Sequence, residues 1–328
     1  MSTEDSIYNG VTIPKGFAPT RIQGEDTIDL GLVITDGNGN EFVWIEVPKT
    51  IYEDSLYNKN GIPSSSSDWE KISNCLNEYT KDYSNSHSPS FNYVNLYRDM
   101  LKSIYENGGF WIGRYETGNS TPQTSDSEIN FQNKAVTKAN MYPYNYITRD
   151  DAQELSIKMN YENYTSSLMF SIQWDLILKF IETKKVATDP EIKSKLTSEK
   201  GKSIGNYFDS EFLLNRGKFA PYSDLSNWYN FNNDSLPLLV NKCAKQPQLS
   251  NSNAILLTTG ASDSANLQNI YDIAGNVWEW TLDFYSENYQ CIARGSSYNN
   301  SGSANDSYIF ANDYAKSHIG FRIALWKT

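Results

Sequence analysis

Segments typical of strands and segments typical of helices occupy separate stretches of this sequence, and this separation constrains the fold more than any other feature. Apolar runs at 32–34 and 42–47 flank Asp36-Gly37-Asn38-Gly39-Asn40, a segment that accepts the positive φ angles of a tight hairpin. Another strand-like run covers 110–117. Amphipathic helical patterns lie at 69–79, at 94–104, after Thr148 and after Ser171. Because strands and helices do not alternate, the pattern favours an α+β domain over a parallel doubly wound sheet.

The 328 residues are enough for a large core. Residues 1–25 are polar with few periodic apolar positions, so we predict an N-terminal extension there. We predict a single domain over 26–328, with a helical insertion at about 67–107. Aromatic residues make up 14% of the chain and charged residues only 20%. The remaining polarity comes from Asn, Ser, Thr and Tyr, which suit turns and contact surfaces, so we expect little regular secondary structure.

Charge and terminal sequence exclude several classes of partner. The 39 acidic and 28 basic side chains give a net charge of −11, which disfavours nucleic acid. The N-terminus lacks the basic and apolar regions of a signal peptide, and no apolar run reaches ~18 residues. We therefore expect cytoplasmic synthesis, no membrane contact and a monomer. Three scattered cysteines and two histidines fit neither a disulfide framework nor a His-rich metal centre.

Three motifs near the C-terminus are the most informative part of the chain. Tyr271–Thr281 reads YDIAGNVWEWT, Arg294–Tyr298 reads RGSSY, and Ile319–Arg322 reads IGFR. In this order the motifs resemble the signature of the formylglycine-generating enzyme (sulfatase-modifying factor) family. The resemblance implies an irregular α+β domain, a variant of the C-type lectin fold, over about residues 30–328. Arg294 and Arg322 are most simply structural, because an arginine in an irregular core ties loop carbonyls together.

The resemblance also bears on catalysis. Enzymes of the family carry two cysteines after the RGSSY-like motif, at places held here by Asn300 and Asn305. An asparagine neither binds Cu(I) nor exchanges disulfides. The resemblance therefore implies that the fold is retained without the catalytic apparatus, so that neither copper nor iron is expected. The alternative is an oxidative enzyme with a relocated catalytic residue, Cys291 or Cys243, which would need an open, electropositive pocket.

Residues 299–318 have the composition of a contact loop. Asn, Ser, Asp and Tyr account for 12 of these 20 residues, and such residues dominate antibody-like binding loops. The layout resembles the variable region of retroelement-diversified proteins, which use the same fold. This resemblance implies a ligand- or receptor-binding protein of a phage tail, hence associated with the virion, or of a bacterial diversification system, with a protein or glycan as partner. The alternative is an ordinary turn-rich loop.

The contact surface should cover about residues 298–318. The expected contact residues, clustered on one face and largely solvent-exposed, are Tyr298, Asn299, Asn300, Asn305, Asp306, Tyr308, Asn312, Asp313 and Tyr314. The expected buried residues beneath them are Trp278, Trp280, Phe321 and Ile323. A display surface must vary without disturbing the core, so polar and tyrosine positions should point outward.

A metal site is the last implication of the resemblance. In the family one structural calcium ion is held by positions that map onto Asp272, Gly275, Val277 and Glu279. Carboxylate and carbonyl oxygens are suitable ligands for Ca²⁺. The alternative is that Glu279 caps backbone amides or pairs with an arginine.

Overall fold

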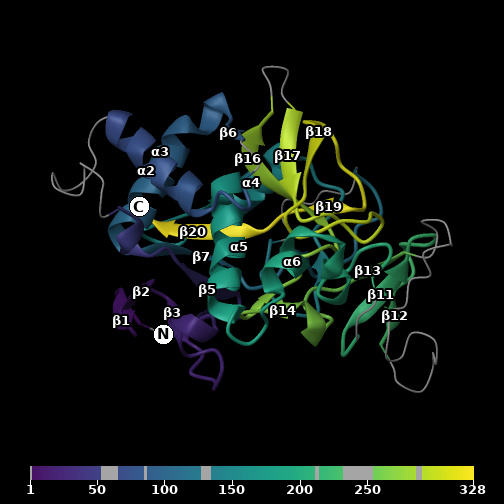
Figure 1. Cartoon of the computed structure of the whole chain (residues 1–328). Coiled ribbons are helices and arrows are strands. Elements are labelled where there is room, and N and C mark those ends of the chain that lie inside the picture. The colour runs from purple at the N-terminus through teal and green to yellow at the C-terminus, as the bar shows by residue number, and fades with distance from the viewer. Residues whose placement is uncertain are drawn as a thin grey trace.

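The computed structural model describes residues 2–52, 66–84, 87–126, 134–210, 214–231, 254–285 and 290–328. Figure 1 shows helices gathered at one end and in the middle of the molecule, with many short strands around them. Strands and helices do not alternate along the chain. The α+β class predicted from the sequence is confirmed.

The larger sheet holds the predicted hairpin. Its order is β10-β20-β7-β5-β4-β3, and every neighbouring pair is antiparallel. Its strands are β3 (Phe17–Pro19), β4 (Val33–Asp36), β5 (Glu41–Glu46), β7 (Gly109–Gly113), β10 (Tyr164–Leu168) and β20 (Ile323–Lys327). Asp36 fixes the turn between β4 and β5, because its Oδ1 accepts the N–H groups of Asn38 and Asn40, both at 2.8 Å. β7 ends earlier than predicted, because the Arg114 carbonyl accepts the N–H of Tyr271, a residue outside the larger sheet, at 2.8 Å.

The second sheet carries the sequence motifs. Its order is β18-β17-β16-β19, and β6 also pairs with β16. Its strands are β6 (Ser88–Pro89), β16 (Trp278–Phe284), β17 (Gln290–Arg294), β18 (Ser307–Ala311) and β19 (Ile319–Gly320). The chain passes from β19 directly to β20 of the larger sheet, so the IGFR motif joins the two sheets.

The predicted helices all form. They are α2 (Ser66–Tyr79), α3 (Val94–Asn107), α4 (Arg149–Ile157) and α5 (Ser171–Lys185), and a short α6 (Ile192–Thr197) follows them. Gly108 ends α3 with φ of 77°, and Thr148 caps α4 by accepting the Asp151 N–H at 3.2 Å. Ser171 is the first residue of α5 and not its cap, which is Phe170. α3 packs on β7 and β20, and α5 packs on β5.

Short strands and single helical turns complete the described chain. The strands are β1 (Ser6–Tyr8), β2 (Val11–Ile13), β8 (Gly118–Asn119), β9 (Tyr142–Pro143), β11 (Lys218–Pro221), β12 (Tyr229–Asn230), β13 (Ile255–Leu257), β14 (Asn266–Leu267) and β15 (Ile270–Tyr271). The 3-10 turns are Ile28–Leu30, Lys49–Tyr52, Phe91–Tyr93, Glu199–Ser203 and Asp263–Ala265. Across the described ranges, no helix is long and apolar enough to span a membrane.

The N-terminal segment differs from its prediction. β1 and β2 form a hairpin, β3 is a strand of the larger sheet, and Val11, Ile13 and Phe17 are buried. Residues 2–25 are therefore ordered against the core and are not an arm. The sequence misled because these strands have three residues each, too few for a recognisable alternation of apolar and polar positions. That residues 26–328 form one domain with an inserted helical pair stays a prediction.

Candidate ligand-contact surface

The predicted contact segment is built on the edge strand β18. β18 pairs only with β17 in its sheet, for example through Ala293 and Tyr308. Of the nine predicted residues, four are exposed: Asn300, Tyr308, Asn312 and Asp313. Three are half-buried: Asn305, Asp306 and Tyr314. The expected base is present, because Trp278, Trp280, Phe321 and Ile323 are all buried.

Two predicted residues are buried, contrary to expectation. Tyr298 has no exposed surface, and its hydroxyl lies 3.0 Å from the Ser317 hydroxyl. Its ring packs with Val277 and neighbouring apolar side chains. Asn299 is only 8% exposed and accepts a hydrogen bond from the Ser297 hydroxyl at 2.9 Å. These two residues therefore support the surface from below. The position of Tyr298 inside the RGSSY motif was a sequence signal that it is buried.

An aromatic cluster underlies the exposed part of the segment. Tyr308 is 57% exposed, and its ring centroid lies 4.8 Å from that of Phe310 and 6.0 Å from that of Trp278. Phe310 stacks on Tyr314 at 4.6 Å, and the Tyr314 hydroxyl is 2.8 Å from Nε2 of His318. Burial lowers the pKa of His318 to about 4, with the Lys316 charge adding to the shift. The imidazole is therefore neutral at pH 7, and the cluster holds Tyr308 in place without a charge.

The two asparagines at the positions of the family's cysteines make ordinary loop contacts. Oδ1 of Asn300 accepts a hydrogen bond from the Ser297 hydroxyl at 2.9 Å. The backbone carbonyl of Asn300 accepts one from the Phe208 N–H at 2.9 Å. Asn305 donates its N–H to the Leu196 carbonyl at 3.0 Å. Cys291 is buried in β17, and burial raises the pKa of its thiol to about 11. Little thiolate forms there at neutral pH, so this cysteine is a poor nucleophile. Cys243 lies outside the described residues.

In this arrangement, protein groups bond to the two predicted carboxylate ligands of calcium, Asp272 and Glu279. Arg322 Nε lies 3.1 and 3.0 Å from the two oxygens of Glu279, and Nη2 lies 2.6 Å from Oε1. Asp272 accepts the Gly260 N–H at 2.7 Å. Val277 N–H donates to Glu116 at 3.1 Å. Among the described residues, no group of three or more His, Cys, Asp or Glu side chains is placed to hold a metal ion. The alternative reading, an arginine partner for Glu279, matches the structure.

The carboxylates around Arg322 are nonetheless unusual. Burial raises the pKa of Asp272 to about 6, and it also raises the pKa of Glu279. The pKa of Glu116 is raised further, first by burial and then by the charges of Asp272 and Glu279. Sequence reasoning did not single out Glu116, although a carboxylate inside the strand-like run at 110–117 was a usable signal. These groups form a buried polar network that fixes the motif region.

Arg294 has the structural role expected of it. Its Nη2 donates to Asp175 Oδ1 at 2.8 Å, and its Nε donates to the Asp306 carbonyl at 3.2 Å. Its guanidinium also lies 5.8 Å from the ring centroid of Trp174. Arg294 thus ties α5 to the turn that leads into β18, beneath the contact segment.

The family comparison agrees with this geometry. Residues 216–326, which contain all three motifs, match the sulfatase-modifying factor enzyme 1-like domain. Over these residues the chain is similar to that family, which agrees with the irregular α+β domain of C-type lectin type expected from the motifs.

Two solved structures are similar at a low level. CarF is 14% identical over 67% of this chain and 87% of its own, with a TM-score of 0.42. Treponema denticola variable protein 1 is 14% identical over 67% of this chain and 85% of its own, with a TM-score of 0.37. None of the curated proteins matches this sequence significantly.

Proposed function

We propose that this protein is a non-catalytic ligand- or receptor-binding protein that displays a variable contact surface, defined as the exposed and half-buried residues of 300–314. The observation that carries the proposal is Tyr308, 57% exposed on an edge strand and seated on buried Trp278 and Phe310. A tyrosine held in this way offers a large contact area at little cost in conformational entropy.

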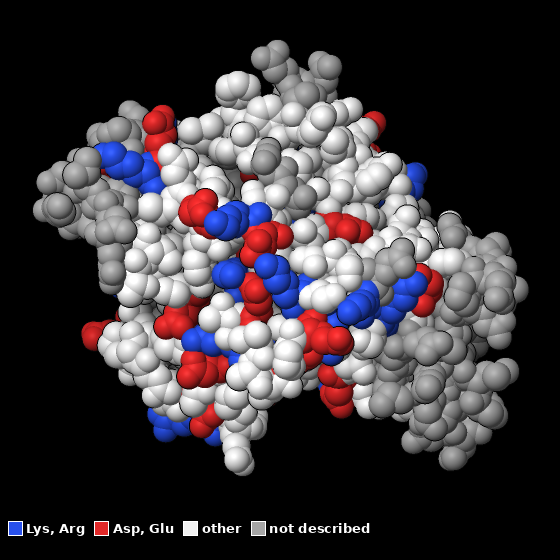
Figure 2. Space-filling model, viewed as in Figure 1, with Lys and Arg blue, Asp and Glu red and all other residues white. Residues whose placement is uncertain are grey.

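The surroundings of Tyr308 suit recognition by shape and hydrogen bonds. Asn300, Asn312 and Asp313 are exposed on the loops that flank β18. Figure 2 shows charged side chains gathered over the middle of the molecule, around α5 and α6, with few over β16–β18. Such a surface lacks the basic character of a nucleic-acid site. We expect a protein or a glycan as the partner of a monomer.

Absence of catalysis is part of the proposal. Asn300 and Asn305 replace the cysteines of the family's enzymes, and the pKa of the buried Cys291 thiol is raised. A peptide carrying a sulfatase-type cysteine should remain unmodified after incubation with the protein and copper. A mass shift to formylglycine would instead establish the alternative, an oxidative enzyme with a relocated catalytic residue.

A display library tests the binding function. One library randomises the exposed residues Asn300, Tyr308, Asn312 and Asp313, and it is selected against immobilised lysozyme and serum albumin. We expect folded binders because these side chains are outside the core. A matched library randomises four exposed charged residues near β1–β3, away from β18: Glu4, Arg21, Asp29 and Glu162. Equal numbers of binders from both libraries would refute a specialised surface.

Diversification by a retroelement is the finer part of the proposal, whether in a phage or in a bacterial diversification system. It predicts a near-repeat of the coding sequence for the terminal segment, differing at adenines, beside a reverse-transcriptase gene. Sequencing of the locus checks this directly. A locus with neither feature would leave a binding surface that is not diversified by this route.

A further inference from the structure

A cavity far from the contact surface lies between the N-terminal hairpin and the larger sheet. Its volume is about 220 Å³, and its walls come from β1–β2, the last turns of α3, β5, β7, β10 and β20. Trp44 and Trp111 are cross-strand partners in its wall, with ring centroids 5.0 Å apart. Tyr164 and Trp326 add two more aromatic rings. Figure 1 places these elements at the end of the molecule opposite β18.

Backbone geometry keeps the cavity open. Asn9 and Gly10 turn the β1–β2 hairpin with φ of 49° and 81°, which brings Thr12 to the rim. Gly109 begins β7, and a Cβ there would lie 2.6 Å from Cζ2 of Trp44. Only a glycine lets the Trp44 ring lie against this strand. The segment expected to be an arm thus forms one wall of a cavity.

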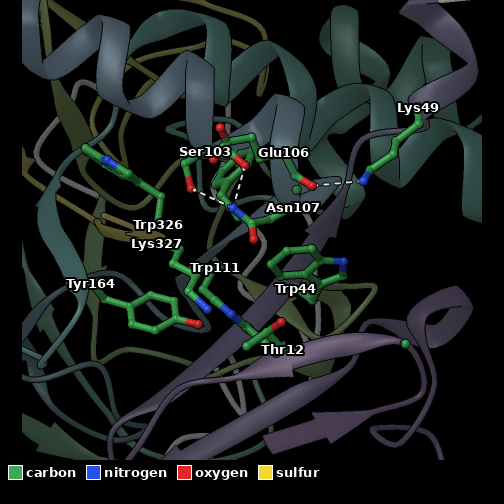
Figure 3. Close-up of a pocket in the computed structure, with 13 residues that line it drawn as sticks. Thr12, Trp44, Lys49, Ser103, Glu106, Asn107, Trp111, Tyr164, Trp326 and Lys327 are labelled. Carbon is green, nitrogen blue, oxygen red and sulfur yellow. Dashed lines mark hydrogen bonds between the residues drawn. The ribbon is translucent and has the colours of Figure 1, made fainter. Parts of the chain in front are cut away.

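Two indole N–H groups in the wall, those of Trp111 and Trp326, have no partner among the described residues. Trp111 is 1% exposed, and its indole N–H makes no hydrogen bond in the structure. A buried donor without an acceptor costs free energy, and buried donors are seldom left in this state. Figure 3 shows the Trp111 nitrogen on the same side of the cavity as the Tyr164 hydroxyl, the Thr12 side chain and the Lys327 ammonium. Burial raises the pKa of Tyr164, so its hydroxyl stays protonated and can donate.

The cavity wall carries charges of both signs. Lys49 donates to the Glu106 carbonyl at 2.8 Å, and Lys327 donates to Asp5 at 3.1 Å. The Glu106 carboxylate also belongs to the wall. Asn107 donates to the Ser103 carbonyl at 2.9 Å, which leaves its side-chain oxygen as an acceptor. A carboxylate in the wall disfavours an anion, whereas a neutral ligand with hydroxyl groups meets both donors and acceptors.

We propose that this cavity binds a neutral, hydroxylated six-membered ring, namely a single pyranose unit. A cavity of ~150 Å³ is enough for benzene, so a six-membered ring fits in about 220 Å³. The rings of Trp44, Trp111 and Trp326 line the cavity, where the C–H groups of the sugar would lie. A sugar oxygen accepts the hydrogen bond of the Trp111 N–H, which has no acceptor among the described residues. This site is separate from the contact surface, and neither depends on the other.

The test is a titration of the full-length protein with methyl pyranosides of glucose, galactose, mannose and N-acetylglucosamine. Binding is followed by tryptophan fluorescence and by saturation-transfer NMR. We expect saturable binding of at least one pyranoside in the millimolar range. Trp111→Phe keeps an aromatic ring and removes the donor, so it should weaken binding about tenfold, the effect of one hydrogen bond. Thr12→Val on the hairpin rim is a second variant that should weaken binding, in case Trp111→Phe does not fold.

A matched control removes a different indole. Trp228 also has a buried N–H without a partner, but it is not part of this cavity. Trp228→Phe should leave the affinity unchanged. Absence of a saturable signal with all four pyranosides up to about 100 mM, well beyond weak millimolar binding, would overturn the proposal. Binding of sodium phosphate in their place, or binding that survives both Trp111→Phe and Thr12→Val, would overturn it as well.

Discussion

The replacement of Glu279 by Gln is the most direct test of how the motif region is stabilised. Arg322 and Glu279 are 0% and 1% exposed, and the guanidinium bonds to both carboxylate oxygens. The same guanidinium donates to the carbonyls of Gly113 at 3.0 Å and Tyr271 at 2.9 Å. A glutamine keeps the size of the side chain but replaces one acceptor oxygen by a donor. The variant therefore removes the carboxylate that bonds to the buried cation, and it leaves only the neighbouring Glu116 and Asp272 to balance the charge.

Removal of one partner from a buried ion pair costs about 3–5 kcal/mol. We expect Glu279→Gln to lose free energy of unfolding in this range, measured by equilibrium urea denaturation with tryptophan fluorescence at pH 7. The control is Glu154→Gln, which removes an exposed partner of Lys158 from a 2.6 Å pair. Exposed pairs contribute about 0–1 kcal/mol. A loss below about 1 kcal/mol for Glu279→Gln would refute the reasoning, because it would mean that the pair is not desolvated.

The same variant decides the question of calcium. Because the guanidinium occupies both oxygens of Glu279, we expect that neither Ca²⁺ nor a chelator shifts the melting temperature of the wild-type protein. An ion that binds only the folded state would raise it by mass action. A rise with Ca²⁺ that disappears in Glu279→Gln would show that Glu279 is a calcium ligand and that Arg322 takes its place only when the ion is absent.

Three further predictions follow from burial and backbone geometry. Gly275→Ala should destabilise the fold far more than Gly10→Ala in thermal melts, because both glycines have positive φ but only Gly275 would place a Cβ 2.4 Å from a backbone oxygen. Tyr308→Ser should change the free energy of unfolding by about 0.5 kcal/mol or less, as surface changes do, whereas Tyr298→Ala should lose about 3–5 kcal/mol, as buried aromatic residues do. Burial raises the pKa of Asp175 from 3.8 to about 6. Between these two pH values the folded state holds a proton that the unfolded state has lost. The contribution of Asp175 to the free energy of unfolding therefore falls as the pH rises to about 6. Asp175→Asn should therefore make stability rise more steeply between pH 4 and 6, by up to about 1.4 kcal/mol per unit; an unchanged slope in urea titrations would contradict this.

Elements with strong local signals could be predicted from the sequence. The Asp-Gly and Asn-Gly turn, the helix cap at Thr148 and the C-terminal glycine of α3 each depend on contacts within a few residues. Local chemistry decides these features, so one sequence is enough to place them. The three motifs indicated the family resemblance, but the second sheet, within and beside which they lie, was not predicted from them.

Features that depend on distant contacts could not be predicted. Burial of Phe17 accompanies the pairing of β3 with β4, which lies more than ten residues further along the chain, and no local pattern predicts it. Tyr298 and Tyr308 are both tyrosines among Asn and Ser, yet one is buried and the other exposed. The difference is set by Ser317, which lies next to the Tyr298 hydroxyl, and by the position of β18 at the edge of its sheet. The sequence shows the composition of such a segment but not the direction of each side chain.

Support for the contact surface comes from residues outside it, and this explains how the surface could vary. Arg322 lies between β19 and β20 and binds Glu279 of β16, so one guanidinium connects the two sheets. Trp278, which precedes Glu279 in β16, forms the base under Tyr308. A substitution at Tyr308 or Asn312 removes no part of this connection, because neither side chain bonds to it. The same logic gives two expectations. Glu279→Gln lies outside the contact surface, but it should disturb ligand binding through Trp278. Substitutions within the surface should alter specificity and leave the fold intact.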